Sequence, residues 1–241
     1  MSIENQTNSW DNIINKLSAF SIAEGITSFV NPYSMLLLKN KPQVTAGVDH
    51  WYVDGISLVK LVQSVFKKPL ERYSFDDTSA APVIFSFVKE HNVPLAIIGT
   101  QKEFIADSVK TIEEKFGIRV TYYRHGFFAN KEEIQQTIQE IIAKDIKVVV
   151  CGMGTPRQEN FLLQLKDAGW KGYGYTCGGY LHQIAKKENY YPHFFDKYNI
   201  RWIYRIYDEP KLLKRYFIKY PQFLAAFTWY AIKKKFTKQK T

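Results

Sequence analysis

The chain has 241 residues, with 33 lysines and arginines against 23 aspartates and glutamates, which gives a formal net charge of +10. Hydrophobic residues make up 46% of the chain, and this excludes wholesale disorder because such a chain can bury enough surface to offset its conformational entropy. Two cysteines in strand-like segments, Cys151 and Cys177, exclude a disulfide framework or a cysteine-type zinc site.

The first ninety residues are predicted to contain two helices and a strand. Residues 11–20 and 56–66 have apolar side chains at helical spacing, and residues 44–53 favour a strand that ends before Asp54 and Gly55. The opening segment carries acidic and amide side chains where a secretion signal has a basic region and an apolar core. No stretch approaches the ~20 apolar residues that span a bilayer. We therefore expect neither a signal peptide nor a membrane-spanning helix.

Strand and helix patterns alternate through the middle of the chain. Short apolar runs predict buried parallel strands, and apolar residues three and four apart predict the helices between them. The predicted strands cover residues 94–99, 118–123, 146–151 and 170–176, and the predicted helices cover 102–116, 130–144 and 156–165. This alternation with short links indicates an α/β fold, a Rossmann-like parallel sheet with helices on both faces.

The end of the chain differs from the rest in charge and composition. Nine of the basic residues and none of the acidic ones lie in residues 211–241, so the preceding part of the chain is nearly neutral. After Pro192 the chain is rich in aromatic and basic residues and shows no strand pattern. We predict an α/β core over residues 1–192 and a C-terminal helical appendage over residues 193–241, with Pro210 as a second candidate boundary.

The first candidate for chemistry is Asp54, which with Gly55 follows a predicted strand. Open α/β sheets bind their ligands at the carboxyl ends of the strands. A carboxylate at that place is a candidate general base, because it can take a proton from a hydroxyl group bound beside it. The alternative is that Asp54 only caps the helix that follows.

A glycine-rich turn after the strand at 146–151 is the second candidate. Gly152, Gly154 and Thr155 let the backbone approach a ligand, and the N–H groups at the start of the next helix attract an anion such as a diphosphate. Arg157 and Gln158 add hydrogen-bond donors. The turn lacks the lysine of a P-loop and the third glycine of a dinucleotide fingerprint, so on spacing alone a purely structural turn is the alternative.

The whole string from Val149 to Asn160 is more specific than its parts. It resembles the signature of the WecG/TagA/CpsF glycosyltransferases, glycosyltransferase family 26, in which a strand runs into G-x-G-x-P-[KR]-Q-E. The similarity continues in the other blocks of that family, which match this chain at Asn31, Asp54, Arg72 and Arg205. The resemblance extends over residues 25–217.

This resemblance implies an inverting glycosyltransferase that moves an N-acetylmannosamine-type sugar, or its uronate, from a UDP donor. The implied acceptor is an undecaprenyl-diphosphate-linked sugar in cell-surface polysaccharide synthesis, at the cytoplasmic face of the membrane. The resemblance also implies no cofactor and no bound metal, and the sequence agrees, since it has no D-x-D motif and no clustered His or carboxylate ligands. The implied catalytic base is Asp54. The implied donor- or phosphate-binding residues are Asn31, Arg72, Gly152, Gly154, Thr155, Gln158, Arg205 and Arg215.

Some positions depart from the pattern of the family. Phe29 stands where many members have threonine, His182 follows Leu181 where many have a Phe-Asp pair, and Tyr190 stands where many have the arginine of an Arg-Ala-Pro block. These changes lie on the expected substrate side and leave the donor and acceptor sugars open. His182 and Tyr190 are candidates to replace contacts of the family, although His182 has a structural role as its alternative.

The basic tail interleaves lysines with aromatic and apolar residues, which predicts an amphipathic helix in the interface of an anionic membrane. The predicted membrane-contacting residues are Phe217, Phe223, Phe227, Trp229, Tyr230, Lys233, Lys234 and Lys235. A helix packed on the core with a frayed basic end is one alternative. Two other classes of function remain as alternatives. One is a nucleotide-sugar-binding protein without turnover, and the other is a nucleic-acid-binding protein, although the sequence shows no base-stacking platform.

Overall fold

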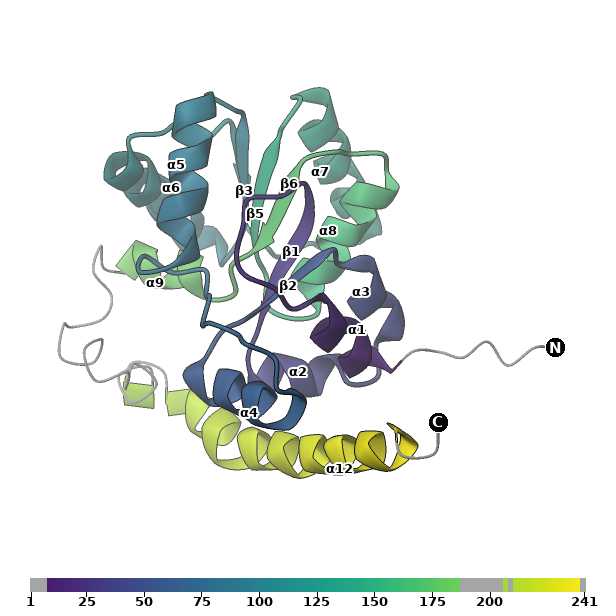
Figure 1. Cartoon of the computed structure of the whole chain (residues 1–241). Coiled ribbons are helices and arrows are strands. Elements are labelled where there is room, and N and C mark those ends of the chain that lie inside the picture. The colour runs from purple at the N-terminus through teal and green to yellow at the C-terminus, as the bar shows by residue number, and fades with distance from the viewer. Residues whose placement is uncertain (1–7, 187–205, 208–209, 239–241) are drawn as a thin grey trace.

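The computed structural model describes residues 8–186, 206–207 and 210–238 (Figure 1). Its centre is a sheet whose strands lie in the order β2-β1-β6-β5-β3-β4, and every neighbouring pair is parallel. The strands are β1 (Gly25–Val30), β2 (His50–Val53), β3 (Leu95–Gly99), β4 (Tyr122–Arg124), β5 (Val148–Gly152) and β6 (Tyr173–Thr176). The predicted Rossmann-like parallel sheet is confirmed.

Helices connect the strands and extend beyond the last one. The α-helices are α1 (Ser9–Lys16), α2 (Pro32–Leu38), α3 (Pro42–Gly47), α4 (Ile56–Phe66), α5 (Ala80–His91), α6 (Lys102–Phe116), α7 (Lys131–Ala143), α8 (Arg157–Asp167), α9 (Tyr180–Lys186) and α12 (Tyr220–Lys238). A 3₁₀ turn, η1 (Pro210–Leu212), and a π-helical turn, η2 (Arg215–Lys219), lead into α12.

The helices cover both faces of the sheet, and strand β5 shows why. Val149 and Cys151 point into a core shared with α1, α2, α4, α7, α8 and α12, while Val148 and Val150 point into a core shared with α5, α6 and α9. Successive side chains of a strand point to opposite faces, so a strand that is apolar throughout needs helices on both sides. The predicted arrangement of helices on both faces is confirmed.

Two predicted elements near the N-terminus differ from the structure. Residues 44–53 were expected to form a strand, but Pro42–Gly47 is helix α3 and the strand begins only at His50. Pro42 occupies the first turn of α3, where its missing N–H is no loss. Helix α1 ends at Lys16 rather than at residue 20, because Leu17 is extended and bridges to Trp51. The helices predicted at 56–66 and 102–116 are confirmed with the same bounds.

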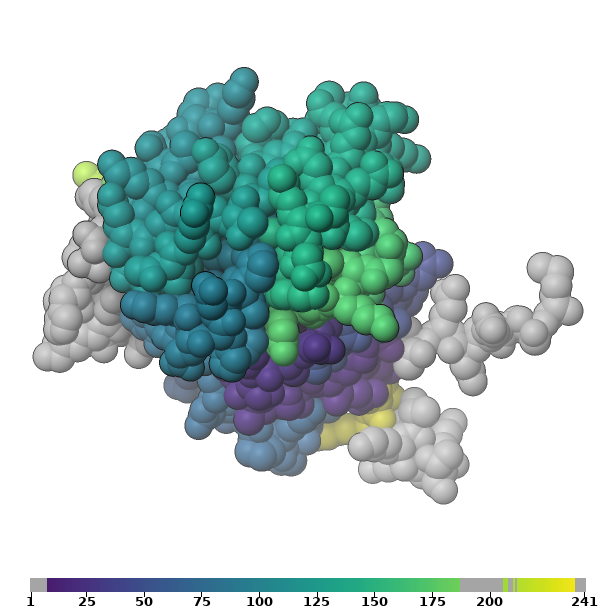
Figure 2. All heavy atoms as spheres, turned by 90° about the horizontal axis from the view of Figure 1, so that it is seen from above, coloured from purple at the N-terminus to yellow at the C-terminus, as the bar shows by residue number. Residues whose placement is uncertain are grey.

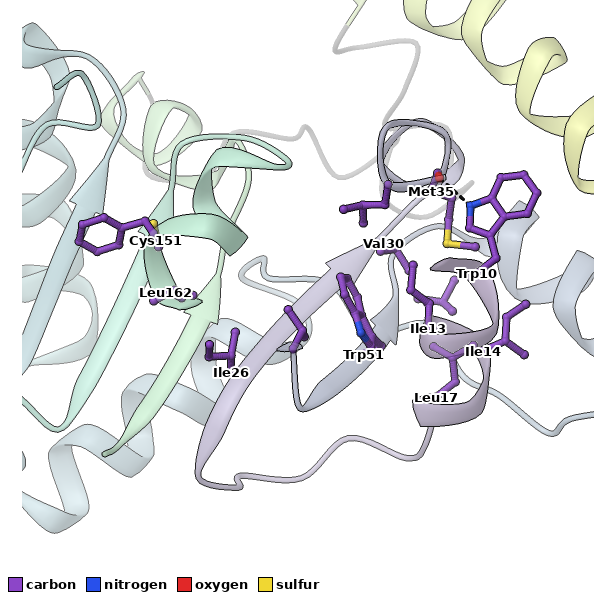
Figure 3. Packing of buried hydrophobic residues seen from close by; sticks show 14 of the residues in the cluster. Trp10, Ile13, Ile14, Leu17, Ile26, Val30, Met35, Trp51, Cys151 and Leu162 are labelled. Atoms are coloured by element: carbon purple, nitrogen blue, oxygen red, sulfur yellow. Dashed lines mark hydrogen bonds between the residues drawn. The ribbon is translucent and has the colours of Figure 1, made fainter. Parts of the chain in front are cut away.

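Helix α12 packs against the core through one aromatic face. Phe223, Phe227 and Tyr230 surround Trp10 of α1, with ring centroids between 5.3 and 5.8 Å from the indole ring. The Trp10 indole N–H in turn donates to the Met35 carbonyl of α2 at 2.7 Å (Figure 3). Phe223 and Phe227 are 0% exposed. The end of the chain is therefore fixed to the N-terminal helices by apolar burial.

This packing corrects part of the predicted membrane-contacting set. Phe223, Phe227 and Tyr230 cannot face lipid, because they are buried against Trp10. Lys234 is also drawn inward, since it forms an ion pair with Asp11 of α1. The remaining members of the predicted set, Phe217, Trp229, Lys233 and Lys235, stay exposed.

Helix α12 runs along one side of the molecule, below α2 and α4 in Figure 1. Seen from above, it shows only as a narrow yellow patch at the margin (Figure 2). Within the described ranges, no helix is long and apolar enough to cross a membrane. The predicted boundary at residues 192 and 193 lies outside the described residues.

Candidate active site

A cavity of about 900 Å³ lies at the carboxyl ends of the strands, which is where open α/β sheets bind ligands. The segments that follow all six strands line it, and η2 contributes from the C-terminal segment. Of the predicted site residues, those that line this cavity are Asn31, Asp54, Arg72, Gly152, Gly154, Thr155, Gln158 and Arg215. Arg205 lies outside the described residues. The tertiary structure thus brings together residues that are up to 184 positions apart in the chain.

Asp54 is the first residue after β2, and its backbone continues the sheet. Its N–H donates to the Val30 carbonyl at 2.7 Å. The next segment returns along the same strand end, because the Tyr73 N–H donates to the Val53 carbonyl at 2.9 Å. Arg72 therefore lies beside Asp54, with 3.6 Å between Nη2 and the carboxylate Oδ1. The Asp54 side chain is 37% exposed, so a bound hydroxyl group can reach it.

The glycine-rich turn packs closely against the turn after β6, and its predicted contact with a ligand stays a prediction. A Cβ atom at Gly152 would lie 2.7 Å from Cys177 Sγ, which is too close for any side chain. Gly154 has a φ of +74°, a left-handed conformation that favours glycine. Helix α8 begins just after this turn, at Arg157. The N–H groups of Arg157 and Gln158 donate to the Gly154 carbonyl, at 2.9 and 3.2 Å, so the turn offers an anion the positive end of the α8 dipole rather than open N–H groups.

A buried carboxyl group lies under this turn. Glu159 is fully buried, and its Oε1 accepts hydrogen bonds from Ser28 Oγ at 2.9 Å, Thr155 Oγ1 at 3.0 Å and Gln158 Nε2 at 3.1 Å. Its Oε2 is buried without a hydrogen-bond partner among the residues described. Burial raises the pKa of Glu159, although these hydrogen bonds act in the opposite direction. Glu159 ties the turn after β5 to strand β1.

Gln158 belongs to the same network. Its amide nitrogen donates to Glu159, and its amide oxygen accepts from the Gly178 N–H at 3.2 Å. On the other side of Glu159, Thr176 Oγ1 donates to Ser28 Oγ at 2.9 Å. The network thus links the ends of β1, β5 and β6. Gln158 was predicted to bind the donor, and the structure places it at the cavity wall, 3% exposed, with its amide engaged by the protein.

Asn31 and Arg215 join the first turn of the cavity to the C-terminal segment. The Asn31 Oδ1 caps α2 by accepting the N–H groups of Tyr33 and Ser34, and it also accepts from Arg215 Nη2 at 3.0 Å. The Arg215 guanidinium lies 4.5 Å from the centre of the Tyr33 ring, a cation–π geometry. One cation of the tail is therefore held at the cavity, as the sequence predicted.

Sequence reasoning missed several residues of the site. Ser28, Glu159 and Thr176 form the buried network, and Asp76 pairs with Arg72 at 2.8 Å. Only Glu159 had a signal, because it is part of the quoted family string. His182 lines the cavity with its ring edge-on to Phe104, at 4.7 Å between centroids.

The charge of the cavity lining is mixed, because its described part contains three arginines, Arg72, Arg157 and Arg215, and two carboxylates, Asp54 and Asp76. Among the described residues, no three His, Cys, Asp or Glu side chains gather as metal ligands. The expectation of a metal-independent reaction stays a prediction. Tyr190 lies outside the described residues.

A parallel α/β sheet with a cavity at the carboxyl ends of its strands is the arrangement of a ligand-binding α/β protein. The family model described as "Glycosyl transferase WecG/TagA/CpsF family" matches residues 2–237, so the chain belongs to this family. It is 34% identical over 226 residues to UDP-Gal:alpha-D-GlcNAc-diphosphoundecaprenol beta-1,4-galactosyltransferase of Shigella boydii. That match covers 93% of this chain and 94% of the relative. The predicted family is confirmed.

Proposed function

We propose that this glycosyltransferase moves a hexose from a UDP donor to a sugar on a polyprenyl diphosphate, with inversion at the sugar carbon. The observation that carries this proposal is the placement of Asp54 in one cavity with the glycine-rich turn and with Arg72 and Arg215. The similarity to the Shigella galactosyltransferase supports the donor and acceptor classes. A role in cell-surface polysaccharide synthesis follows from such an acceptor.

The chemistry is a single displacement. Asp54 takes the proton of the acceptor hydroxyl group while the oxygen of that hydroxyl group forms a bond to C1 of the donor sugar. The bond from C1 to the diphosphate oxygen breaks on the opposite side, and UDP leaves. Arg72, Arg215 and the positive end of the α8 dipole stabilise the charge that develops on the leaving diphosphate. Asn31 positions Arg215 for this role.

The donor sugar is the finer part of the proposal. The family resemblance favours an N-acetylmannosamine-type sugar, whereas the Shigella relative is named for galactose. UDP-galactose is the first donor to test, because the similarity to that relative extends over nearly the whole chain. UDP-N-acetylmannosamine and its uronate are the second and third. A screen with a synthetic lipid-diphosphate-GlcNAc acceptor, read by mass spectrometry, identifies the product.

The role of Asp54 is tested with Asp54→Asn. We expect kcat to fall by about 10²–10⁴, since the amide cannot take a proton, while the Kd for UDP stays near that of the wild type. Single-turnover assays and UDP titration measure the two quantities. Wild-type turnover in Asp54→Asn removes Asp54 as the base.

A binding protein without turnover is the rival from another class. Formation of UDP that depends on the lipid-linked acceptor distinguishes a transferase from a binding protein, because a binding protein leaves the UDP-sugar intact. The conversion of donor must then equal the amount of glycosylated acceptor formed.

We also propose that α12 lies on the inner surface of the cell membrane, where a lipid-linked acceptor is found. Trp229 and Phe236 of α12 are 61% and 65% exposed, and Lys233 and Lys235 lie between them in the chain. Phe217, in the preceding turn η2, is 65% exposed. Large exposed aromatic side chains with neighbouring lysines are typical of an interfacial helix. Stronger binding to nucleic acid than to anionic vesicles would contradict this proposal.

A further inference from the structure

The cavity lies across the point at which the connections of the sheet change direction. Strands β3 and β5 are neighbours in the sheet. From β3 the chain continues through α6 to β4 on one side, and from β5 it continues through α8 to β6 on the other side. Open α/β sheets bind their ligands in the crevice outside two such strand ends. The residues that follow β3 therefore share this crevice with the glycine-rich turn that follows β5.

Thr100, the first residue after β3, connects three of the turns around the crevice. Its N–H donates to the Gly152 carbonyl at 3.0 Å, and its own carbonyl accepts from the Gly126 N–H at 2.9 Å. The turns are closely packed here, since a Cβ atom at Gly99 would lie 2.5 Å from the Gly152 carbonyl oxygen. The side chain of Thr100 is the first one beyond this close contact, and Thr100 lines the cavity.

The backbone of Thr100 has an unfavourable conformation for its residue type. Its φ is +50°, in the left-handed region. A β-branched residue is an outlier there, whereas glycine adopts the same conformation without strain. Strained residues of this kind cluster at ligand sites, where the surrounding structure maintains them. A threonine here costs stability that a glycine would not cost, which indicates that its side chain has a role other than stability.

The hydroxyl group of Thr100 is available to a ligand. Thr155 and Thr176 also line the cavity, but their hydroxyl groups donate to Glu159 at 3.0 Å and to Ser28 at 2.9 Å. In the described part of the chain, no group forms a hydrogen bond with the Thr100 hydroxyl group. A threonine hydroxyl group can donate one hydrogen bond, and a phosphate oxygen is a strong acceptor for it.

We propose that Thr100 binds the diphosphate of the donor through its hydroxyl group, at the expense of a strained backbone. The inference rests on the proposed function, in which the donor is a UDP-sugar. The glycine-rich turn approaches the diphosphate from the end of β5, and Thr100 donates to it from the end of β3. A hydrogen bond to a charged oxygen is stronger than one between neutral groups, so its loss lowers the affinity for UDP measurably.

The first test is the Kd for UDP, measured by isothermal titration calorimetry with the full chain. Thr100→Val keeps the β-branched shape and removes the hydroxyl group, and we expect its Kd to rise by about tenfold. Thr100→Ser keeps the hydroxyl group, and its Kd should stay within about threefold of the wild-type value.

The second test is Thr100→Gly, in which stability and binding change in opposite directions. The midpoint of urea denaturation should rise by roughly a few tenths of a molar, because glycine relieves the strain. The Kd for UDP should rise by about tenfold, as in Thr100→Val.

Lys67→Gly is the matched control for this variant. Lys67 also has a left-handed backbone, with a φ of +54°, but it follows α4 and does not line the cavity. Its replacement by glycine should raise the urea midpoint in the same way and leave the Kd for UDP unchanged.

These measurements distinguish a failure of this inference from a failure of the proposed function. An unchanged Kd for UDP in folded Thr100→Val or Thr100→Gly overturns the inference, and so does an equal rise in Thr100→Ser or Lys67→Gly. A lower urea midpoint in Thr100→Gly also overturns it, because the side chain would then support the fold. Absence of UDP binding by the wild-type protein instead overturns the proposed donor class.

Discussion

The floor of the cavity and the outer face of α12 depart from the usual distribution of side chains in opposite ways. At the floor, Gln158 and Glu159 are polar and buried. On α12, Trp229 and Phe236 are apolar and exposed. Buried polar groups and exposed apolar patches are the informative exceptions in a folded protein. Both exceptions here coincide with a proposed binding surface: the buried polar groups with that for the nucleotide sugar, and the exposed aromatic groups with that for the membrane.

The inner face of α12 shows the ordinary case for comparison. Phe227 is two residues, or about half a turn, from Trp229 in the same helix, and it is fully buried between Trp10 and Phe66. The two faces of one helix therefore have different roles: the inner face attaches the segment to the core, and the outer face is open to a partner.

The largest expected effect is on the inner face. Phe227→Ala should lower the free energy of unfolding by about 3–5 kcal/mol, since it leaves a cavity among packed aromatic rings. Urea denaturation measures the change. Trp229→Ala is the matched control and should change stability by no more than about 0.5 kcal/mol. Equal losses in the two variants would show that the faces do not differ as the structure has them.

The outer face should lose membrane affinity rather than stability. The double variant Trp229→Ser, Phe236→Ser is expected to bind vesicles with anionic lipid at least about tenfold more weakly. The reason is that transfer of each aromatic side chain from water into the membrane lowers the free energy of the bound state. Sedimentation with vesicles measures the affinity. Val83→Ser with Tyr123→Ser is the control, since both side chains are 48% exposed outside α12. An equal loss of affinity in the control pair would contradict the assignment of this surface.

The cavity floor should show a smaller effect that depends on pH. Burial raises the pKa of Glu159 in the folded state above its value of about 4.5 in the unfolded state. At a pH between these two pKa values, the native state binds more protons than the unfolded state. The free energy of unfolding of the wild type therefore falls as pH rises through this window, by up to about 1.4 kcal/mol per pH unit from this group. Glu159→Gln lacks this contribution. The stability of the wild type relative to Glu159→Gln should thus decrease from pH 5 to pH 7.

Urea denaturation of both proteins at the two pH values measures this difference, in which the contributions of other groups largely cancel. A difference that stays constant or grows with pH would mean that Glu159 does not retain its proton on folding. A rise in KM for the donor in Glu159→Gln is expected as well, because an amide replaces the carboxyl group to which Thr155 and Gln158 donate.

Much of the candidate site was accessible from the sequence because of how parallel sheets are built. Asp54, Gly152 and Thr155 each come just after an apolar strand, and such positions meet at one edge of a parallel sheet. Asp76 gave no comparable signal, since it does not follow a strand and its ion pair with Arg72 is visible only in the structure. Ser28 and Thr176 lie within strands, where their alternation with apolar residues only suggests partial burial.

The sequence by itself determined the parallel α/β architecture, the family and the edge of the sheet where the cavity lies. These depend on local periodicity, glycine positions and a contiguous motif, all of which are written along the chain. The tertiary structure decided which face of α12 is buried, which carboxylate lies closest to Arg72, and which groups form hydrogen bonds with the Gln158 amide. These depend on partners far away in the chain, such as Trp10 for Phe227, and no pattern within a single segment specifies them.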